Sequence, residues 1–200
     1  MCGVLALAAC TPAAESDMTS AAPSPSPTRS PTPDPTPTSH VLSIAEAGEL
    51  YLDIVCASNA TGTDLEGAFE DGESEFLAGG DPDVSAVNDA AARLADQYRK
   101  AAELFDDDYF VWPDEVRDLG GHVRDRMIAD LGTLSSMTNA VTYRDAYYAS
   151  FGQPTPEQES AAQEIRYVLD LPSDTVASCA GHEGGLQERY DAFLERGEGE

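Results

Sequence analysis

Residues 11–40 restrict the possible folds of this chain more than any other feature. Eight prolines, six serines and six threonines fill twenty of these thirty positions. Proline fixes the backbone φ angle and has no N–H to donate, so such a segment favours polyproline II and forms neither helix nor sheet. We therefore expect a disordered Pro/Ser/Thr-rich linker, followed by a single folded domain of about 160 residues.

A short apolar run precedes this linker and ends in Leu7-Ala8-Ala9-Cys10. Small residues followed by a cysteine resemble the lipobox of bacterial lipoproteins. The linker is similar to those of uncharacterised surface lipoproteins from high-GC Gram-positive bacteria. The resemblance implies cleavage before Cys10, a diacylglycerol with palmitate chains on its sulfur, and a place on the extracytoplasmic face of the cell membrane. Because no later stretch approaches the roughly 18–20 apolar residues of a membrane span, Cys10 would be the membrane anchor.

The start of the chain departs from this pattern. Met1-Cys2-Gly3 carries no Lys or Arg, although a signal peptide normally has a basic residue before its apolar core. We interpret residues 1–9 as part of a signal peptide that begins upstream, and residues 10–40 as the lipidated cysteine with its linker. The alternative is that Cys10 is an ordinary cysteine near a soluble N-terminus.

The remaining sequence predicts an all-α fold, an antiparallel bundle of four to five helices over residues 41–196, with a frayed tail at 197–200. Capping boxes at Ser43–Glu46 and Thr155–Gln158 indicate two helix starts. Pro113 indicates a third, and Asp83 can cap a fourth. Apolar residues three and four apart follow each start, and a last helix is expected at about 185–196.

The secondary structure of two stretches is harder to predict. Residues 62–82 contain five glycines and a proline, so we expect a loop between the first and second helices. The third helix has an apolar stripe from Val116 to Val141, but Thr138-Asn139 and Thr142 are possible break points. No alternating β-branched run is long enough to predict a strand.

The domain contains two cysteines, Cys56 and Cys179. An even number in an exported protein predicts a disulfide, which would join the first helix to the segment before the last. A zinc site is the competing interpretation, because Cys179 and His182 form a C-x-x-H pair that Cys56 and His122 would have to complete. We expect the disulfide, no metal and no cofactor.

The charge of the chain excludes one class of partner. Asp and Glu number 37 against 11 Lys and Arg, for a formal net charge of −26. Nucleic-acid binding needs Lys and Arg to displace phosphate counterions, so we expect no nucleic-acid partner. Cations or basic partners are favoured, although repulsion that keeps the protein soluble explains the same composition.

A cluster of rings is the one candidate binding site. Tyr143, Tyr147, Tyr148 and Phe151 lie within nine residues. These rings either pack one end of the bundle or form an aromatic groove for a peptide, sugar or small ligand.

The sequence thus predicts a lipoprotein that is not an enzyme and acts by binding or by envelope interaction, with an envelope protein or small ligand as its partner. One alternative is a wall-directed hydrolase that uses paired carboxylates. The other is a cation-dependent structural protein of the cell surface.

Overall fold

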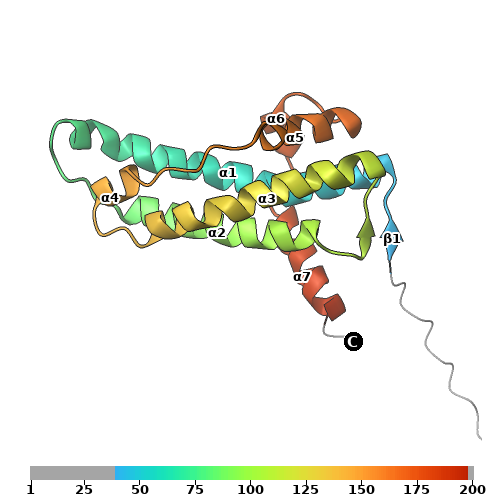
Figure 1. Ribbon diagram of the computed structural model, residues 1–200. Helices are drawn as coiled ribbons and strands as arrows, with labels where there is room; N and C mark the ends of the chain where they lie inside the picture. The colour runs from blue at the N-terminus through green and yellow to red at the C-terminus, as the bar shows by residue number, and fades with distance from the viewer. Residues whose placement is uncertain (1–38, 198–200) are drawn as a thin grey trace, which may run out of the picture. The chain divides into compact units, whose positions relative to one another are not determined.

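The computed structural model describes residues 39–197, and within them the protein is all-α (Figure 1). Cys10, the signal peptide and most of the linker lie outside these residues. Five helices have thirteen residues or more, namely α1 (Ile44–Leu77), α2 (Ser85–Phe105), α3 (Asp114–Thr138), α5 (Pro156–Val168) and α7 (Gly185–Gly197). Two helices of five residues, α4 (Tyr143–Tyr147) and α6 (Thr175–Cys179), were not predicted.

The three longest helices form the body of the bundle. α2 runs antiparallel to both α1 and α3 and packs against them. α5 covers part of α3, and α7 crosses α1 and α2. α4 lies at the end of the bundle farthest from residue 39, beside the last turns of α1 (Figure 1). We call this the far end, and the opposite end, where the described chain begins, the entry end.

The predicted helix starts are confirmed. Both capping boxes are formed, since the Ser43 and Thr155 side chains each accept from the backbone N–H three residues ahead. Pro113 stands immediately before α3. α2 begins close to the predicted position, but Val84 and not Asp83 occupies its N-cap; Asp83 accepts a 3.1 Å hydrogen bond from the Ser85 N–H. Local side-chain chemistry therefore determines where α1 and α5 begin.

The predicted loop at 62–82 is wrong for most of its length, because α1 continues to Leu77. Glycines in a helix cost about 1 kcal/mol each relative to alanine. Leu65 and Phe76 are nonetheless buried against the rest of the bundle, and this burial outweighs the cost. The helix ends at Leu77, and Gly79 follows its C-cap with a positive φ that suits a residue without a side chain.

The third helix ends at the first of the two possible break points. Asn139 caps α3, and the Thr142 side chain then starts α4 in a capping box with Asp145. Val141 lies between the two helices and is 85% exposed, so its predicted place on the buried stripe is wrong.

The structure also contains a short parallel pairing that the sequence did not predict. β1 (His40–Val41) pairs with β2 (Phe110–Val111). The pairing is two residues long, which is too short to leave a periodic pattern in the sequence. It holds the chain against the loop between α2 and α3 at the entry end.

The core divides into two groups of buried side chains. The entry-end cluster includes Leu50, Ile54, Cys56, Leu104, Val116, Ile165 and Leu186. The far-end cluster contains Leu65, Phe76, Val87, Ala90, Ala91, Leu94, Ala95, Leu134, Met137, Tyr143 and Ala146. Tyr98 packs against both clusters. Between residues 39 and 197, none of the helices is long and apolar enough to cross a membrane.

Candidate functional site

The four predicted aromatic residues gather at the far end but have different environments. Tyr143 is fully buried, and its ring centroid lies 5.8 Å from that of Phe69 and 5.4 Å from that of Phe76. Its hydroxyl donates to the backbone carbonyl of Phe69. Burial and the nearby Glu73 carboxylate raise the Tyr143 pKa. Tyr143 is therefore a core residue that attaches α4 to α1.

The close approach of Tyr143 depends on a glycine in α1. A Cβ atom added to Gly72 would lie 2.5 Å from Cε2 of the Tyr143 ring. Any larger residue would therefore push the ring away. Gly72 lies within the segment that sequence reasoning assigned to a loop, and the ring that needs it comes from a distant part of the chain.

Tyr147 is half-buried and is held through its hydroxyl. The hydroxyl donates a 2.9 Å hydrogen bond to Oε1 of Glu73, and this bond raises the Tyr147 pKa. Its ring lies 4.9 Å from that of Phe76. Phe151 is half-buried against the far-end cluster.

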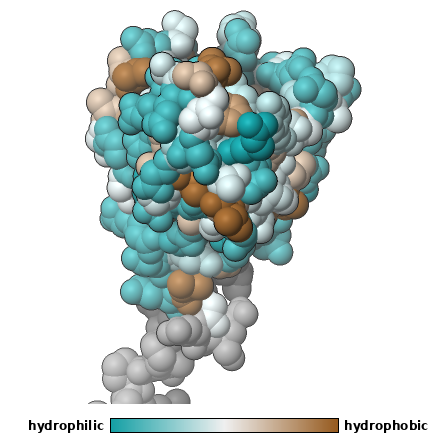
Figure 2. All heavy atoms as spheres, turned by 90° about the vertical axis from the view of Figure 1, so that its left-hand side faces the viewer, coloured by the Kyte–Doolittle hydropathy of each residue, from teal (hydrophilic) through white to brown (hydrophobic). Residues whose placement is uncertain are grey.

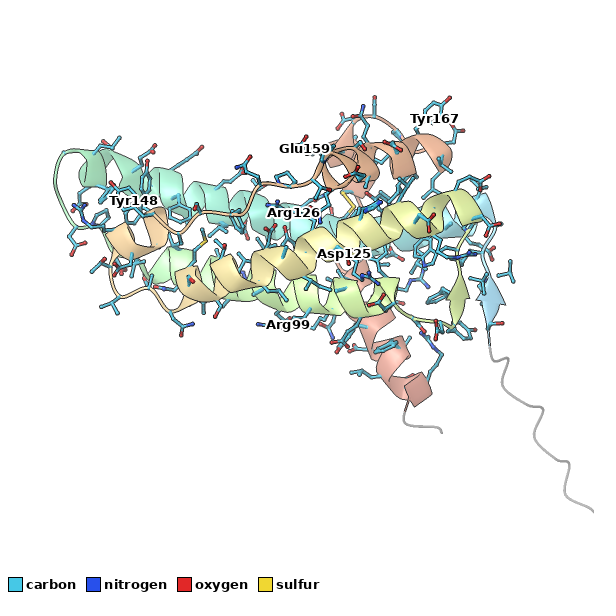
Figure 3. The ribbon with its side chains drawn as sticks, in the orientation of Figure 1. Arg99, Asp125, Arg126, Tyr148, Glu159 and Tyr167 are labelled. Atoms are coloured by element: carbon cyan, nitrogen blue, oxygen red, sulfur yellow. A yellow bond between two sulfur atoms is a disulfide. The ribbon has the colours of Figure 1, made fainter. Side chains whose placement is uncertain are left out.

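Tyr148 is the one predicted ring with most of its side chain free. It is 66% exposed and projects at the far end beside α1 (Figure 3). Leu77 is 70% and Val141 is 85% exposed. Leu77, Val141 and Tyr148 together make up what we call the far-end surface. Sequence reasoning missed Leu77 and Val141 because it placed the first in a loop and the second in the core.

Acidic residues are frequent in the segments that form this surface. The segments that form it, residues 70–83 and 139–149, contain seven carboxylates and one cation, Arg144. The Arg144 guanidinium lies 5.2 Å from the centre of the Phe76 ring. Figure 2 looks at this end of the molecule and shows apolar groups scattered among hydrophilic side chains. The far end therefore presents apolar side chains in a strongly negative surrounding.

The predicted disulfide is confirmed. The sulfur atoms of Cys56 and Cys179 are bonded at 2.03 Å and join residues 123 apart in sequence. Because both sulfurs are consumed in this bond, they are not zinc ligands in this structure. In the part of the chain that the structure describes, no group of three or more His, Cys, Asp or Glu side chains is arranged to hold a metal ion.

A polar cluster that the sequence did not predict lies near the disulfide. Asp53 Oδ1 is 2.7 Å from His182 Nδ1, and Asp53 Oδ2 accepts a 2.9 Å hydrogen bond from Arg189 Nε. A Cβ added to Gly185 would lie 2.4 Å from Asp53 Oδ1, so the start of α7 fits tightly against this carboxylate. Asp53 thus links α1 to the C-terminal segment at a second point besides the disulfide.

The buried acid of the bundle belongs to an ion pair. Asp130 accepts a 2.9 Å hydrogen bond from Arg126 Nε, and Arg126 donates a second, of 2.7 Å, to the Gly152 carbonyl. Burial raises the Asp130 pKa, and Arg126 partly offsets this rise. The partner of this carboxylate is an arginine, so the arrangement attaches the segment before α5 to α3 (Figure 3).

A pocket of about 220 Å³ lies between α1, α2 and α7, away from the far end. Two cations line it, but both are already paired. Arg93 lies 3.3 Å from Asp64, and Lys100 lies 2.6 Å from Asp96. The two cations of this pocket are therefore compensated from within the chain.

Comparison with known proteins gives no relative: no family model, no curated protein and no solved structure matches this chain.

Proposed function

We propose that this chain is a lipid-anchored protein of the extracytoplasmic face of the cell membrane, whose helical domain acts by non-catalytic binding. The observation that carries the proposal is the Cys56–Cys179 disulfide. Disulfides form and persist in oxidising compartments and are rare in the cytosol. The bond therefore supports export, which is the condition that the lipobox-like Leu7-Ala8-Ala9-Cys10 also requires.

The linker supports the same proposal. Its proline content favours an extended chain of about 3.1 Å per residue, which holds a domain away from the membrane. A domain held in this way is placed to bind other molecules of the cell envelope. Its far end exposes apolar side chains among carboxylates, as a surface used for contact with a partner would.

Metabolic labelling with a clickable palmitate tests the anchor. We expect the wild type to be labelled and to sediment with membranes, whereas Cys10→Ala should lose the label. Cys2→Ala is the matched control, since Cys2 lies before the proposed cleavage site, and it should be labelled like the wild type. Label retained in Cys10→Ala, or reduced Cys56 and Cys179 thiols in protein taken directly from cells, would contradict the proposal.

Chemical crosslinking of the intact protein in its native envelope tests the binding role. We expect a discrete adduct that is identified by mass spectrometry and is absent when the envelope is solubilised before crosslinking. Absence of any adduct under conditions that crosslink other envelope proteins would count against a binding protein.

A further inference from the structure

The far end of the bundle has the features of a docking surface. Leu77, Val141 and Tyr148 expose most of their side chains, and they come from two segments that are far apart in the chain. With about 1.5 Å of rise per residue, the 34 residues of α1 place this surface about 50 Å from the entry end. A partner can therefore reach it without meeting the point where the linker joins the domain.

The carboxylates around this surface are mostly free. Three of the seven acids accept hydrogen bonds from side chains nearby: Glu73 from Tyr147, Asp83 from Ser85, and Asp145 from Thr142. The other four acids are exposed, and none of them forms an ion pair with any side chain of residues 39–197; they are Glu70, Asp71, Glu75 and Asp81. Their charge is thus available to a partner.

The charge decides what can cover this surface. A second copy of the chain would bring equally acidic groups against these four, and like charges across an interface are unfavourable. Anionic lipid headgroups and nucleic acid are repelled for the same reason. A protein segment rich in Lys and Arg is attracted, and an apolar side chain on it would bury the exposed side chains of the far end.

We infer that the far-end surface docks a basic protein segment that carries at least one apolar side chain. The apolar contact supplies the binding, and the four free carboxylates attract the partner and orient it. This inference rests on the proposed binding role and adds the location of the surface and the chemistry of the partner.

Binding of a synthetic probe to the full-length chain tests the inference. The probe is a short fluorescent peptide of Lys and Leu, and its affinity is measured by fluorescence anisotropy. Two counterparts define the chemistry, one with Glu in place of every Lys and one with Ser in place of every Leu. We expect both to bind at least about tenfold more weakly. Binding should also weaken as ionic strength rises towards about 1 M, where the Debye length falls to about 3 Å.

Two sets of variants locate the binding. The far-end set neutralises the four free acids as Glu70→Gln, Asp71→Asn, Glu75→Gln and Asp81→Asn. The control set removes the same charge from four exposed acids elsewhere, as Asp118→Asn, Glu159→Gln, Glu164→Gln and Glu195→Gln. We expect at least about tenfold weaker binding for the first set and less than about threefold for the second. Equal losses would overturn the inference, because they would indicate attraction to the acidic chain as a whole.

A second pair of variants tests the apolar contact. Leu77→Ser with Val141→Ser should weaken binding of the probe, while Val41→Ser with Tyr167→Ser should not, although Val41 and Tyr167 are as exposed. Unfolding curves identify any variant that fails to fold. Tight self-association of the wild type, or stronger binding to anionic vesicles than to the probe, would overturn the inference. If native crosslinking finds a partner that contacts another face, this inference fails while the proposed binding role stands.

Discussion

The two ends of the bundle are built differently. At the entry end, bonds between distant parts of the chain fix the fold: the disulfide, the Asp53 cluster, and Arg196, which pairs with the half-buried Asp107 and lies 4.4 Å over the Tyr109 ring. At the far end, aromatic packing around Tyr143 holds α4 against α1. The charged groups that join distant segments at the entry end are paired with each other, whereas the four exposed acids of the far end form no ion pair within residues 39–197.

The difference indicates a division of roles. A charge that is already paired within the chain has little left to offer a partner, so the entry end is suited to holding the fold together. The far end keeps its charge and its apolar side chains available, so it is suited to contact with another molecule. Variants that affect one end and leave the other intact test this view.

Removal of the disulfide should cause the largest loss in the free energy of unfolding. The bond closes a loop whose ends are 123 residues apart, and the loop-entropy relation gives a loss of about 4–5 kcal/mol from the free energy of unfolding. Urea unfolding of Cys56→Ala with Cys179→Ala against the oxidised wild type measures it. A loss below about 1 kcal/mol would mean that the other entry-end contacts suffice without the bond.

Truncation of the Tyr143 ring at the far end should cause the second-largest loss in the free energy of unfolding. Tyr143→Ala removes a fully buried aromatic side chain, and such changes cost about 3–5 kcal/mol. Tyr148→Ala is the matched control from the same turn of chain; because that side chain is 66% exposed, it should cost less than about 0.5 kcal/mol. Similar losses for the two variants would contradict the division between core and surface at this end.

Alkaline pH should destabilise the entry end through Tyr51. Burial raises the pKa of this side chain from 10.0 to about 12, partly offset by the charge of Arg166. The folded state therefore keeps its proton while the unfolded state releases it. Stability is fully present below pH 10 and falls as pH rises towards 12, by about 2 kcal/mol.

Urea unfolding between about pH 9 and pH 12 measures this loss. Tyr51→Phe should lose less stability over this range than the wild type, because it has no phenol to ionise. Tyr167→Phe, in which the replaced ring is 88% exposed, should keep the wild-type slope. If Tyr51→Phe kept that slope as well, Tyr51 would not be the cause.

Two glycines of α1 should give effects of opposite sign. Gly72→Ala would place Cβ against Tyr143 and should cost about 1–3 kcal/mol. A Cβ at Gly67 would have no heavy atom within 4 Å, so Gly67→Ala should stabilise the helix by about 0.5–1 kcal/mol. Thermal or urea unfolding of the two variants compares them directly. Stabilisation by both changes would show that the ring does not need the space.

The features that the sequence predicted correctly depend on neighbouring residues. Ser43 with Glu46 and Thr155 with Gln158 form capping boxes through contacts three residues apart, and such contacts leave a readable pattern. The pairing of Cys56 with Cys179 followed from their being the two cysteines of the domain. The all-α class followed from the spacing of apolar residues.

The features that the sequence missed depend on residues far apart. The last turns of α1 are stable because Phe76 meets rings from α4, and no local pattern shows that contact. Asp53 and His182 are 129 residues apart, so nothing near either one indicates the other. Among the predicted groove residues, the sequence could not separate the buried Tyr143 from the exposed Tyr148.

Site-specific photocrosslinking in the native envelope is the most direct test of this division of roles. A benzophenone amino acid replaces Val141 at the far end or Val41 at the entry end, two valines that are 85% and 72% exposed. The account predicts that position 141 captures a protein through a segment rich in Lys and Arg, and that position 41 captures nothing. Adducts from position 41 alone, or an acidic segment captured at position 141, would contradict it.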